Sequence, residues 1–249
     1  NYDRSAGLTT QLDLEADLEN LEDFSEAPIQ WGFGPHFNEK GRSVSCVDLQ
    51  EKYKDFNVLF IGEDSPKIYL TFDEGYENGF TPRILDILKE KEVKATFFIT
   101  GVYYRRAPEL IKRMIDEGHT VGSHSDKHID FTKSTPADCI ADLTLLHENI
   151  RKDFNYEMRC FRFPTGSFSQ RSLELLKDMG YKSVFWSFGY KDWDPSVQMP
   201  PEEALTKLKN SIHPGEVLLL HPMGETNCTI LGDFIDTVKE KGYEFASPV

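Results

Sequence analysis

The sequence has few cysteines, a shortage of basic residues and no long apolar run. Its 28 Lys and Arg against 42 Asp and Glu give a net charge of -14 without a basic cluster, which argues against nucleic acid or an anionic membrane as a partner. No apolar run approaches the roughly 20 residues that cross a bilayer, so we expect no membrane-spanning segment. The cysteines are too few and too scattered for a disulfide scaffold, a zinc knuckle or a redox motif, although pairing stays open; they are Cys46, Cys139, Cys160 and Cys228.

The first 30 residues, 1–30, are strongly acidic. They carry eight Asp and Glu and a single basic residue, Arg4. A charge block of this kind is typical of a solvated arm, so we predict an acidic, flexible N-terminal arm. A short docked helix through Leu14, Leu18 and Leu21 is the alternative, because these residues recur at helical spacing. The segment has no signal-peptide pattern, which leaves a cytoplasmic chain or a mature form whose signal was removed.

Residues 31–66 are rich in Pro, Gly and Asn and include the stretch WGFGPHF. We predict an irregular segment that packs on the rest of the chain through Trp31, Phe33 and Phe37. No linker rich in Pro, Gly or Ser interrupts the sequence after it, so we expect one domain over residues 67–249.

From residue 67 onward, short apolar runs alternate with amphipathic stretches, a pattern typical of β/α units around a largely parallel sheet. We predict an α/β fold, a distorted or incomplete (β/α) barrel of about seven strands, with an open doubly wound sheet as the competing arrangement. The strands are expected near residues 67–72, 95–100, 119–123, 159–163, 182–187, 216–221 and 243–246. Helices are expected to begin near Pro82, Pro136 and Pro201, one helix to run from Ser169 to Gly180, and others to end near Gly118 and Gly242.

Polar residues follow five of these strands. Because the carboxyl ends of strands in barrels and open α/β sheets share one face, we expect these side chains to converge on one site. Each has an ordinary explanation alone: a His-x-x-x-His pair arises by chance, and Asp-Glu can open a turn. Five strand ends with such residues in one chain favour a shared functional site over five unrelated structural roles. The residues are Asp73 and Glu74, then His124 and His128, then Arg162, then Asp192 and Trp193, then His221.

The motifs TFDEG, HSDKH, RFPTG, DW and LLHP occur in the order of the five motifs of NodB-like polysaccharide deacetylases. Over residues 67–249 the chain resembles this family of carbohydrate esterases, which remove N-acetyl groups from amino sugars. The stretches TFDEGYENGF, KATFFITG, LIKRMIDEGHTVGSHS and VFWS are most similar to the PdaA-type peptidoglycan N-acetylmuramic acid deacetylases of muramic δ-lactam biosynthesis in the spore cortex. The WGFG lead-in resembles theirs as well.

The resemblance implies an acid–base mechanism. Asp73 would be the general base that deprotonates water, and Arg162 would hold it in a bidentate pair. His221 would protonate the departing amine, and Asp192 would orient His221 and keep it charged.

The resemblance also implies a divalent metal ion, zinc first, with cobalt or manganese as alternatives. His124 and His128, on one face of a helical turn, would bind it. Glu74 departs from the family pattern, which has a second Asp as ligand there, or Asn in the PdaA type. Glutamate is one methylene longer, so we expect Glu74 to be a third ligand only if its surroundings adjust.

Three positions match substrate-binding residues of the family. The backbone N–H near Thr165 would help to hold the oxyanion. Trp193 and Leu219 would form the wall around the acetyl methyl group. Many relatives have an aromatic residue or arginine where this chain has Thr165, so sugar contacts there are not transferred.

The expected function is metal-dependent hydrolysis of the N-acetyl group of peptidoglycan N-acetylmuramic acid. An N-acetylglucosamine deacetylase acting on peptidoglycan or a chitin-like glycan is the alternative within the same chemistry. An inactive carbohydrate-binding protein on the same scaffold is the alternative from another class. The implied partner is a peptidoglycan glycan strand and the implied location is outside the cytoplasmic membrane, secreted or derived from a membrane-tethered precursor. We expect a monomer.

Overall fold

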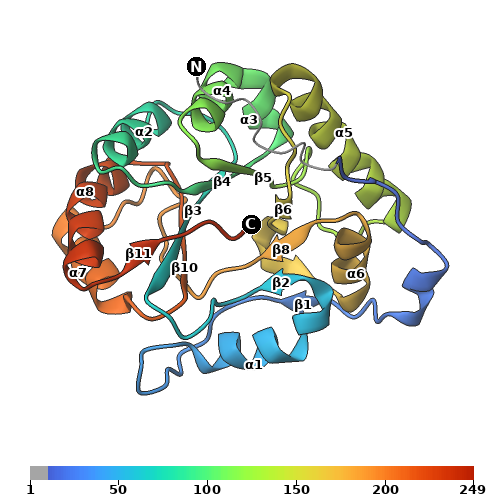
Figure 1. The fold of residues 1–249 in the computed structure, drawn as a ribbon, viewed down its shortest axis with the longest axis horizontal. Helices are drawn as coiled ribbons and strands as arrows, with labels where there is room; N and C mark the ends of the chain where they lie inside the picture. The colour runs from blue at the N-terminus through green and yellow to red at the C-terminus, as the bar shows by residue number, and fades with distance from the viewer. Residues whose placement is uncertain (1–10) are drawn as a thin grey trace, which may run out of the picture.

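The computed structural model describes residues 11–249, and its centre is a curled sheet of nine strands (Figure 1). Eight strands lie in the order β2-β8-β6-β5-β4-β3-β10-β9, and β11 pairs with the beginning of β3. Neighbouring strands of this sheet pair parallel throughout the described residues. The strands are β2 (Val58–Leu59), β3 (Lys67–Glu74), β4 (Thr96–Ile99), β5 (Thr120–Ser123), β6 (Cys160–Phe161), β8 (Lys182–Val184), β9 (Phe188–Gly189), β10 (Glu216–Leu220) and β11 (Glu244–Phe245).

The prediction of an incomplete (β/α) barrel is confirmed. All seven expected strands are present, and β2 and β9 are additional. Within residues 11–249, the edge strands β2 and β9 pair with β8 and β10 and not with each other, so the barrel stays open. The curled sheet with helices around it, seen in Figure 1, replaces the doubly wound alternative.

Helices surround the sheet on its outer side (Figure 1). Their beginnings follow local signals: Pro82 lies in the first turn of α2, Thr135 caps α5, and Ser169 forms a capping box with Ser172 at α6. The helices are α1 (Val44–Lys52), α2 (Thr81–Glu90), α3 (Gly101–Arg106), α4 (Pro108–Asp116), α5 (Pro136–Phe154), α6 (Gln170–Asp178), α7 (Pro201–Ser211) and α8 (Glu225–Glu240). No helix in the described part of the chain is long and apolar enough to cross a membrane.

Residues 31–66 are more regular than we predicted. They contain α1 and β2, so the sheet begins at residue 58 and not at 67. Gln50 of α1 ties the two together, because its Oε1 accepts a hydrogen bond from Phe60 N at 2.8 Å. The sequence concealed α1 because Cys46 is its only buried residue, which leaves little helical periodicity. Trp31 and Phe33 pack on the core as predicted, whereas Phe37 is 46% exposed.

Residues 11–30 lie along the body of the protein. Leu21 is buried, and Arg171 of α6 donates from Nε to its carbonyl oxygen at 3.1 Å. The alternative helix through Leu14 and Leu18 is not formed: one 3₁₀ turn spans Asn20–Asp23, and Leu18 is half exposed. The rest of the predicted flexible arm, residues 1–10, lies outside the described residues. A strand β1 (Ile29–Gln30) then pairs antiparallel with β7 (Ser167–Phe168).

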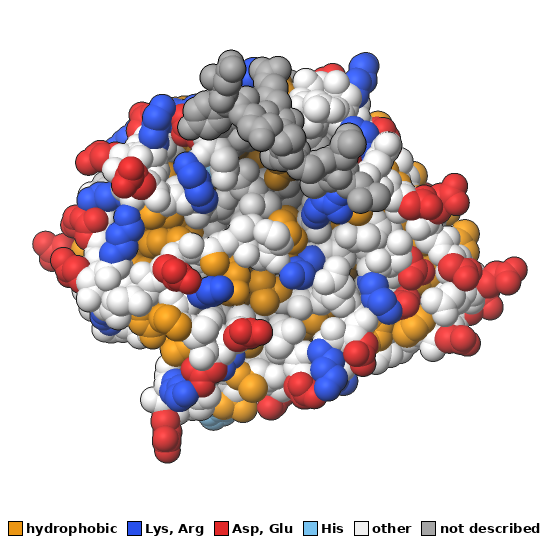
Figure 2. All heavy atoms as spheres, in the orientation of Figure 1, with side chains coloured by type: hydrophobic (Ala, Val, Ile, Leu, Met, Phe, Trp, Pro, Cys, Tyr) orange, Lys and Arg blue, Asp and Glu red, His pale blue; other side chains and the backbone are white. Residues whose placement is uncertain are grey.

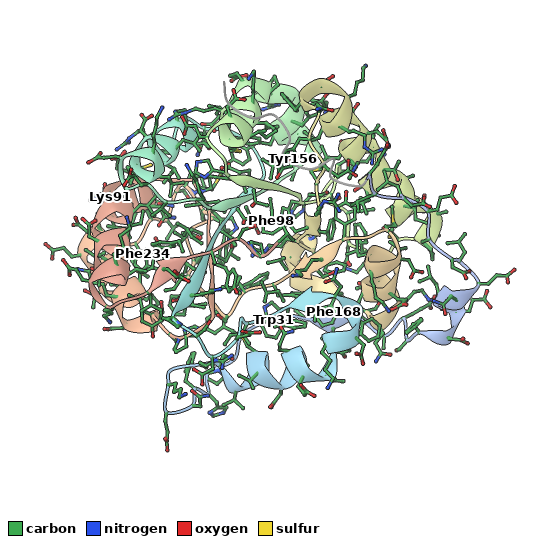
Figure 3. All side chains as sticks on the ribbon, in the orientation of Figure 1. Trp31, Lys91, Phe98, Tyr156, Phe168 and Phe234 are labelled. Atoms are coloured by element: carbon green, nitrogen blue, oxygen red, sulfur yellow. The ribbon has the colours of Figure 1, made fainter. Side chains whose placement is uncertain are left out.

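The interior of the barrel is filled by an aromatic ring. Phe98 of β4 is fully buried with Cys160, Val184 and other apolar residues of the inner face, and Figure 3 shows it at the centre of the molecule. Its neighbour in register on β5 is Gly122, where a Cβ atom would meet the Phe98 ring at 2.8 Å. Glycine at 122 therefore makes room for the ring that lies beneath the site.

The last residues of the described chain pass across the end of the barrel at which the strands begin. After β11, Ser247 Oγ lies 2.9 Å from Thr120 Oγ1 of β5, and Lys182 Nζ of β8 donates to Pro248 O at 2.8 Å. Figure 1 shows this C-terminal segment over the middle of the barrel, and Figure 2 shows charged side chains of both signs interspersed on the same face. The C-terminal segment thus covers the end of the barrel at which the strands begin.

The docking of the N-terminal segment is testable through Leu21. We expect Leu21→Ala to lower the free energy of unfolding by about 2–5 kcal/mol, the usual cost of truncating a buried leucine. Leu18→Ala is the matched control and should change it by less than about 0.5 kcal/mol, because Leu18 is half exposed. Urea denaturation followed by circular dichroism measures both, and equal stability of the two variants would contradict the docked arrangement.

Candidate active site

A cleft of about 520 Å³ opens where the strands end. Seven of the ten residues that we predicted for the site line it: Asp73, His124, His128, Thr165, Trp193, Leu219 and His221. Arg162 and Asp192 are buried and hydrogen-bonded to two of these residues, whereas Glu74 does not line the cleft. The structure therefore brings the polar ends of distant strands together.

Asp73, the last inward-facing residue of β3, forms a buried ion pair. Its Oδ1 accepts a hydrogen bond from Arg162 NH1 at 2.8 Å. Burial raises the pKa of Asp73, but the charge of Arg162, helped by His124 and His221, outweighs burial and holds the pKa below its usual value. Asp73 is consequently ionised at neutral pH.

Arg162 is fully buried and makes three different contacts rather than the predicted bidentate pair. NH1 binds Asp73, Nε donates to Val184 O at 3.0 Å and NH2 donates to Phe185 O at 2.8 Å. The guanidinium also lies over the Phe98 ring, 4.3 Å from its centroid. The bidentate expectation was wrong because two of the three nitrogens bind backbone carbonyls that follow β8.

His124 has one ring nitrogen engaged and one directed toward Asp73. Its Nδ1 lies 2.8 Å from Arg162 O, a carbonyl acceptor, which assigns the proton to Nδ1. Nε2 lies 3.7 Å from Asp73 Oδ2 and keeps its lone pair. Burial lowers the pKa of His124 to about 4, so the imidazole is neutral at neutral pH. A neutral imidazole with its tautomer fixed in this way is the form that binds metals.

His128 lies beside His124, but the two are not on a helical turn as we predicted. Their ring centroids are 4.9 Å apart, and the intervening residues are irregular. Ser125 (φ 71°) and His128 (φ 56°) adopt left-handed backbone, which is uncommon for these residue types. A helical turn would bring residues four apart onto one face. Here the loop brings the two rings together instead through its left-handed backbone angles. Burial lowers the pKa of His128 as well.

His221 and Asp192 form the second polar pair of the cleft. His221 Nδ1 lies 2.7 Å from Asp192 Oδ1, and His221 N donates to Asp192 Oδ2 at 2.8 Å. Burial lowers the pKa of His221, but the hydrogen bond and charge of Asp192 outweigh burial and raise it above its usual value. Because Phe72 and Leu220 pair in register, His221 and Asp73 follow at adjacent ends of β10 and β3.

Asn227 of α8, which no sequence pattern indicated, supports the His221–Asp192 pair. Its Nδ2 donates to Asp192 Oδ2 at 2.7 Å and to His221 O at 2.9 Å. Its Oδ1 accepts from the hydroxyl of Tyr190 at 2.5 Å. Asn227 occupies a buried position on a helix that carries other polar residues, so no strand-end pattern distinguishes it.

Glu74 points away from the cleft. Both carboxyl oxygens lie 3.3 Å from Thr81 Oγ1 at the beginning of α2. Successive residues of a strand face opposite sides, and β3 extends through Glu74, so the carboxyl group faces the helices when Asp73 faces the interior. Burial, followed by the charges of Glu77 and Asp73, raises the pKa of Glu74 well above its usual value. The structure does not bring Glu74 together with the two histidines.

The walls of the cleft are largely aromatic. Trp193 is 54% exposed, and its ring lies 6.0 Å from that of His221. Thr165 adopts left-handed backbone (φ 57°) at the rim, and Leu219 lies on the inner wall. Lining residues that the sequence did not indicate are Gly75, Tyr76, Phe163, Trp186 and Met223.

A second cavity of about 360 Å³ lies between the beginnings of α5 and α6. The hydroxyl groups around it already serve the two helices, because Thr135 caps α5 and Ser169 caps α6. Arg171, which also lines it, is paired with Glu26. Because these groups are already hydrogen-bonded or paired, the second cavity is a feature of helix packing.

The cleft presents an ionised carboxylate and a histidine with a raised pKa at neighbouring strand ends. A base and an acid in one pocket can activate water and protonate a leaving group, which is the chemistry of amide and ester hydrolysis. Together with the open (β/α) barrel, this pair defines a hydrolytic enzyme.

Comparison with known proteins identifies the family. Residues 62–184 match the family model described as polysaccharide deacetylase. The chain is 39% identical over 222 residues to the peptidoglycan-N-acetylmuramic acid deacetylase PdaA of Bacillus subtilis (strain 168), a match covering 88% of this chain and 84% of that protein. The structure of B. subtilis PdaA, a family 4 carbohydrate esterase, matches with a TM-score of 0.84 at 37% identity, covering 90% of this chain and 96% of that one. A family 4 carbohydrate esterase from Bacillus anthracis matches with a TM-score of 0.74 at 40% identity, covering 90% and 95%.

The chain belongs to the polysaccharide deacetylase family, the family 4 carbohydrate esterases, as its five motifs predicted. It is therefore a hydrolase that cleaves N-acetyl amide bonds of polysaccharides.

The pairing of His221 with Asp192 is testable by titration. In the wild type, we expect the His221 imidazole to titrate above the usual pKa of about 6.5. Asp192→Asn removes the carboxylate that raises this pKa, so the titration of His221 should move to lower pH. NMR of the histidine Cε1–H signals measures both.

His213, which lies elsewhere in the structure, serves as the internal reference for this titration. Burial lowers its pKa to about 4, and that value should not respond to the substitution. An unchanged His221 titration in Asp192→Asn would show that Asp192 does not control the charge of His221.

Proposed function

We propose that this enzyme deacetylates N-acetylmuramic acid in peptidoglycan, in the pathway that forms muramic δ-lactam in the spore cortex. The observation that carries the proposal is the similarity to B. subtilis PdaA, which extends over nearly the whole of both chains. An N-acetylglucosamine deacetylase remains the alternative outcome of the test below. We further propose that the enzyme acts outside the cytoplasmic membrane, where this substrate lies, and that it acts as a monomer on a glycan strand.

Asp73 acts as the general base in the proposed mechanism. It is ionised at neutral pH and faces the cleft, so it can take a proton from a water molecule next to the scissile amide. Arg162 keeps the carboxylate ionised and fixes it through the 2.8 Å hydrogen bond. The other two nitrogens of the Arg162 guanidinium donate to backbone carbonyls, so it cannot rotate away without losing these hydrogen bonds.

His221 acts as the general acid. Its raised pKa keeps the imidazolium populated to a higher pH than that of an unperturbed histidine, and the proton leaves from Nε2 because Nδ1 is bound to Asp192. The amine of the sugar receives this proton as the amide breaks. Trp193 and Leu219 enclose the acetyl methyl group, and the backbone N–H of Thr165 stabilises the oxyanion.

His124 and His128 hold a divalent metal ion, zinc in our proposal, with cobalt and manganese as alternatives. Their fit to a metal comes from the neutral state of His124 and the hydrogen bond that fixes its Nδ1 proton. No group of three or more His, Cys, Asp or Glu side chains with metal-binding geometry occurs in residues 11–249, so the protein supplies two imidazoles, with the Asp73 carboxylate beside them. The bound ion would polarise the amide carbonyl and lower the pKa of a bound water.

Acetate release from glycan strands tests the substrate and the metal. Strands freed of their peptides are incubated with the enzyme before chelation, after chelation, and after separate addition of zinc, cobalt or manganese. We expect activity to disappear on chelation and to return with at least one of the ions. Mass analysis of the products should show deacetylated muramic acid, and free glucosamine units alone would instead support the alternative substrate.

The metal ligands are tested by calorimetric titration of zinc into purified variants. Glu74→Gln keeps the size of the side chain and should leave the dissociation constant unchanged within about threefold, because Glu74 faces Thr81. His128→Ala removes a proposed ligand and should weaken binding by more than about tenfold. A large loss of affinity in Glu74→Gln would return Glu74 to the ligand set.

A further inference from the structure

We infer that Asp142 of α5 is a positioning residue that sets the conformation of the loop carrying His124 and His128. This inference rests on the metal role proposed above for the two histidines. The loop, residues 124–129, is called the histidine loop below. Asp142 does not line the cleft, so it acts on the site only through this loop.

The Asp142 carboxylate binds three donors of the histidine loop. Oδ2 accepts from Ser125 Oγ at 2.6 Å and from Asp126 N at 2.8 Å. Oδ1 accepts from Lys127 N at 2.9 Å. All three donors lie between the two histidines, so Asp142 binds the connection that determines how far apart the imidazoles are.

Through the Ser125 hydroxyl, the hydrogen bonds of Asp142 are linked to Ile129, the residue after His128. While its hydroxyl donates to Asp142, Ser125 Oγ accepts a hydrogen bond from Ile129 N at 3.1 Å. The Ser125 backbone N–H donates in turn to Ser123 Oγ at 3.2 Å, at the end of β5. One buried carboxylate thus organises the chain from the strand end to the residue after His128.

The backbone of the histidine loop needs such support. Ser125 and His128 adopt left-handed backbone angles, which L-residues keep only when the surrounding structure imposes them. Asp142 is 5% exposed, so its hydrogen bonds are not replaced by water, and they are strengthened by its charge. Without them, the loop would relax and the two imidazoles would separate.

A second set of contacts, from Arg105 and Gly101, also holds the histidine loop. This second clamp differs from the contacts of Asp142. Asp126 Oδ1 accepts from Arg105 of α3 at 2.7 Å, and Gly101 N donates to Asp126 O at 3.0 Å. This clamp acts mainly on Asp126, with a longer contact of 3.4 Å from Gly101 N to Ser125 O, whereas Asp142 binds three residues of the loop. An Asn at 142 has one acceptor oxygen and would turn its NH₂ group toward a backbone N–H, so it cannot replace Asp142.

Zinc affinity of Asp142→Asn, measured by competition with a chromogenic chelator, tests the inference. We expect the dissociation constant to rise by about 10–100-fold, the usual effect of removing a group that orients metal ligands. Asp138→Asn is the matched control: it lies one turn earlier on α5, removes the same charge, contacts Thr135 and not the histidine loop, and should change zinc affinity by less than about threefold. The absorption spectrum of the cobalt-loaded protein should change in Asp142→Asn and not in the control.

Ser125→Ala is the second variant, in case Asp142→Asn does not fold, as judged by circular dichroism and thermal unfolding without metal. It removes only the hydroxyl that links Asp142 to Ile129, and it should weaken zinc binding in the same direction by less. Unchanged zinc affinity in whichever variant folds overturns the inference, while wild-type binding and chelator sensitivity leave the proposed metal role intact. If the wild type itself neither binds zinc nor responds to chelation, the metal role fails first, and the inference fails with it.

Discussion

The active site is built around the buried guanidinium of Arg162. A positive charge removed from water is costly unless it is paired and hydrogen-bonded, and here each of the three guanidinium nitrogens has a partner: one carboxylate and two carbonyl oxygens at the end of β8. The backbone carbonyl oxygen of Arg162 also accepts a hydrogen bond from Nδ1 of His124. One side chain and its backbone thereby fix the charge of Asp73 and the tautomer of His124. A single residue that does not line the cleft thus sets the charge of the proposed base and the proton position of the proposed metal ligand.

The cleft consists of two halves, each organised by a buried polar residue on a helix. Asp142 of α5 binds the histidine loop, and Asn227 of α8 binds both Asp192 and the backbone of His221. Neither residue lines the cavity. The helices that cover the sheet therefore do more than shield its apolar face, because they deliver hydrogen bonds that orient the side chains at the strand ends. The side chains that line the cleft are therefore distinct from the buried helix residues that orient them.

The barrel could be predicted well from the sequence because it depends on two local signals: the spacing of apolar residues and the residues that follow each strand. Apolar runs located the seven main strands, and the residues after them located five residues that line the cleft, while the family resemblance supplied Thr165 and Leu219. What it missed has physical causes. The helix α1 has a single buried residue, and β2 is two residues long, so neither produces a periodic signal. Asp142 and Asn227 resemble ordinary polar residues on helices, since their partners come from distant parts of the chain. The orientation of Glu74 depends on how far β3 continues, a boundary that sequence patterns do not locate to one residue.

The strand order has a consequence for when the enzyme becomes competent. Strand β10 lies beside β3 with five residues in register, although about 150 residues separate them in the chain. During synthesis, Asp73 at the end of β3 emerges well before His221 at the end of β10. A chain that stops before β10 contains Arg162, Asp73 and both imidazoles of the cleft, yet it lacks the proposed proton donor. Under the proposed mechanism, hydrolysis therefore requires that β10 has joined β3, which ties activity to completion of the central sheet.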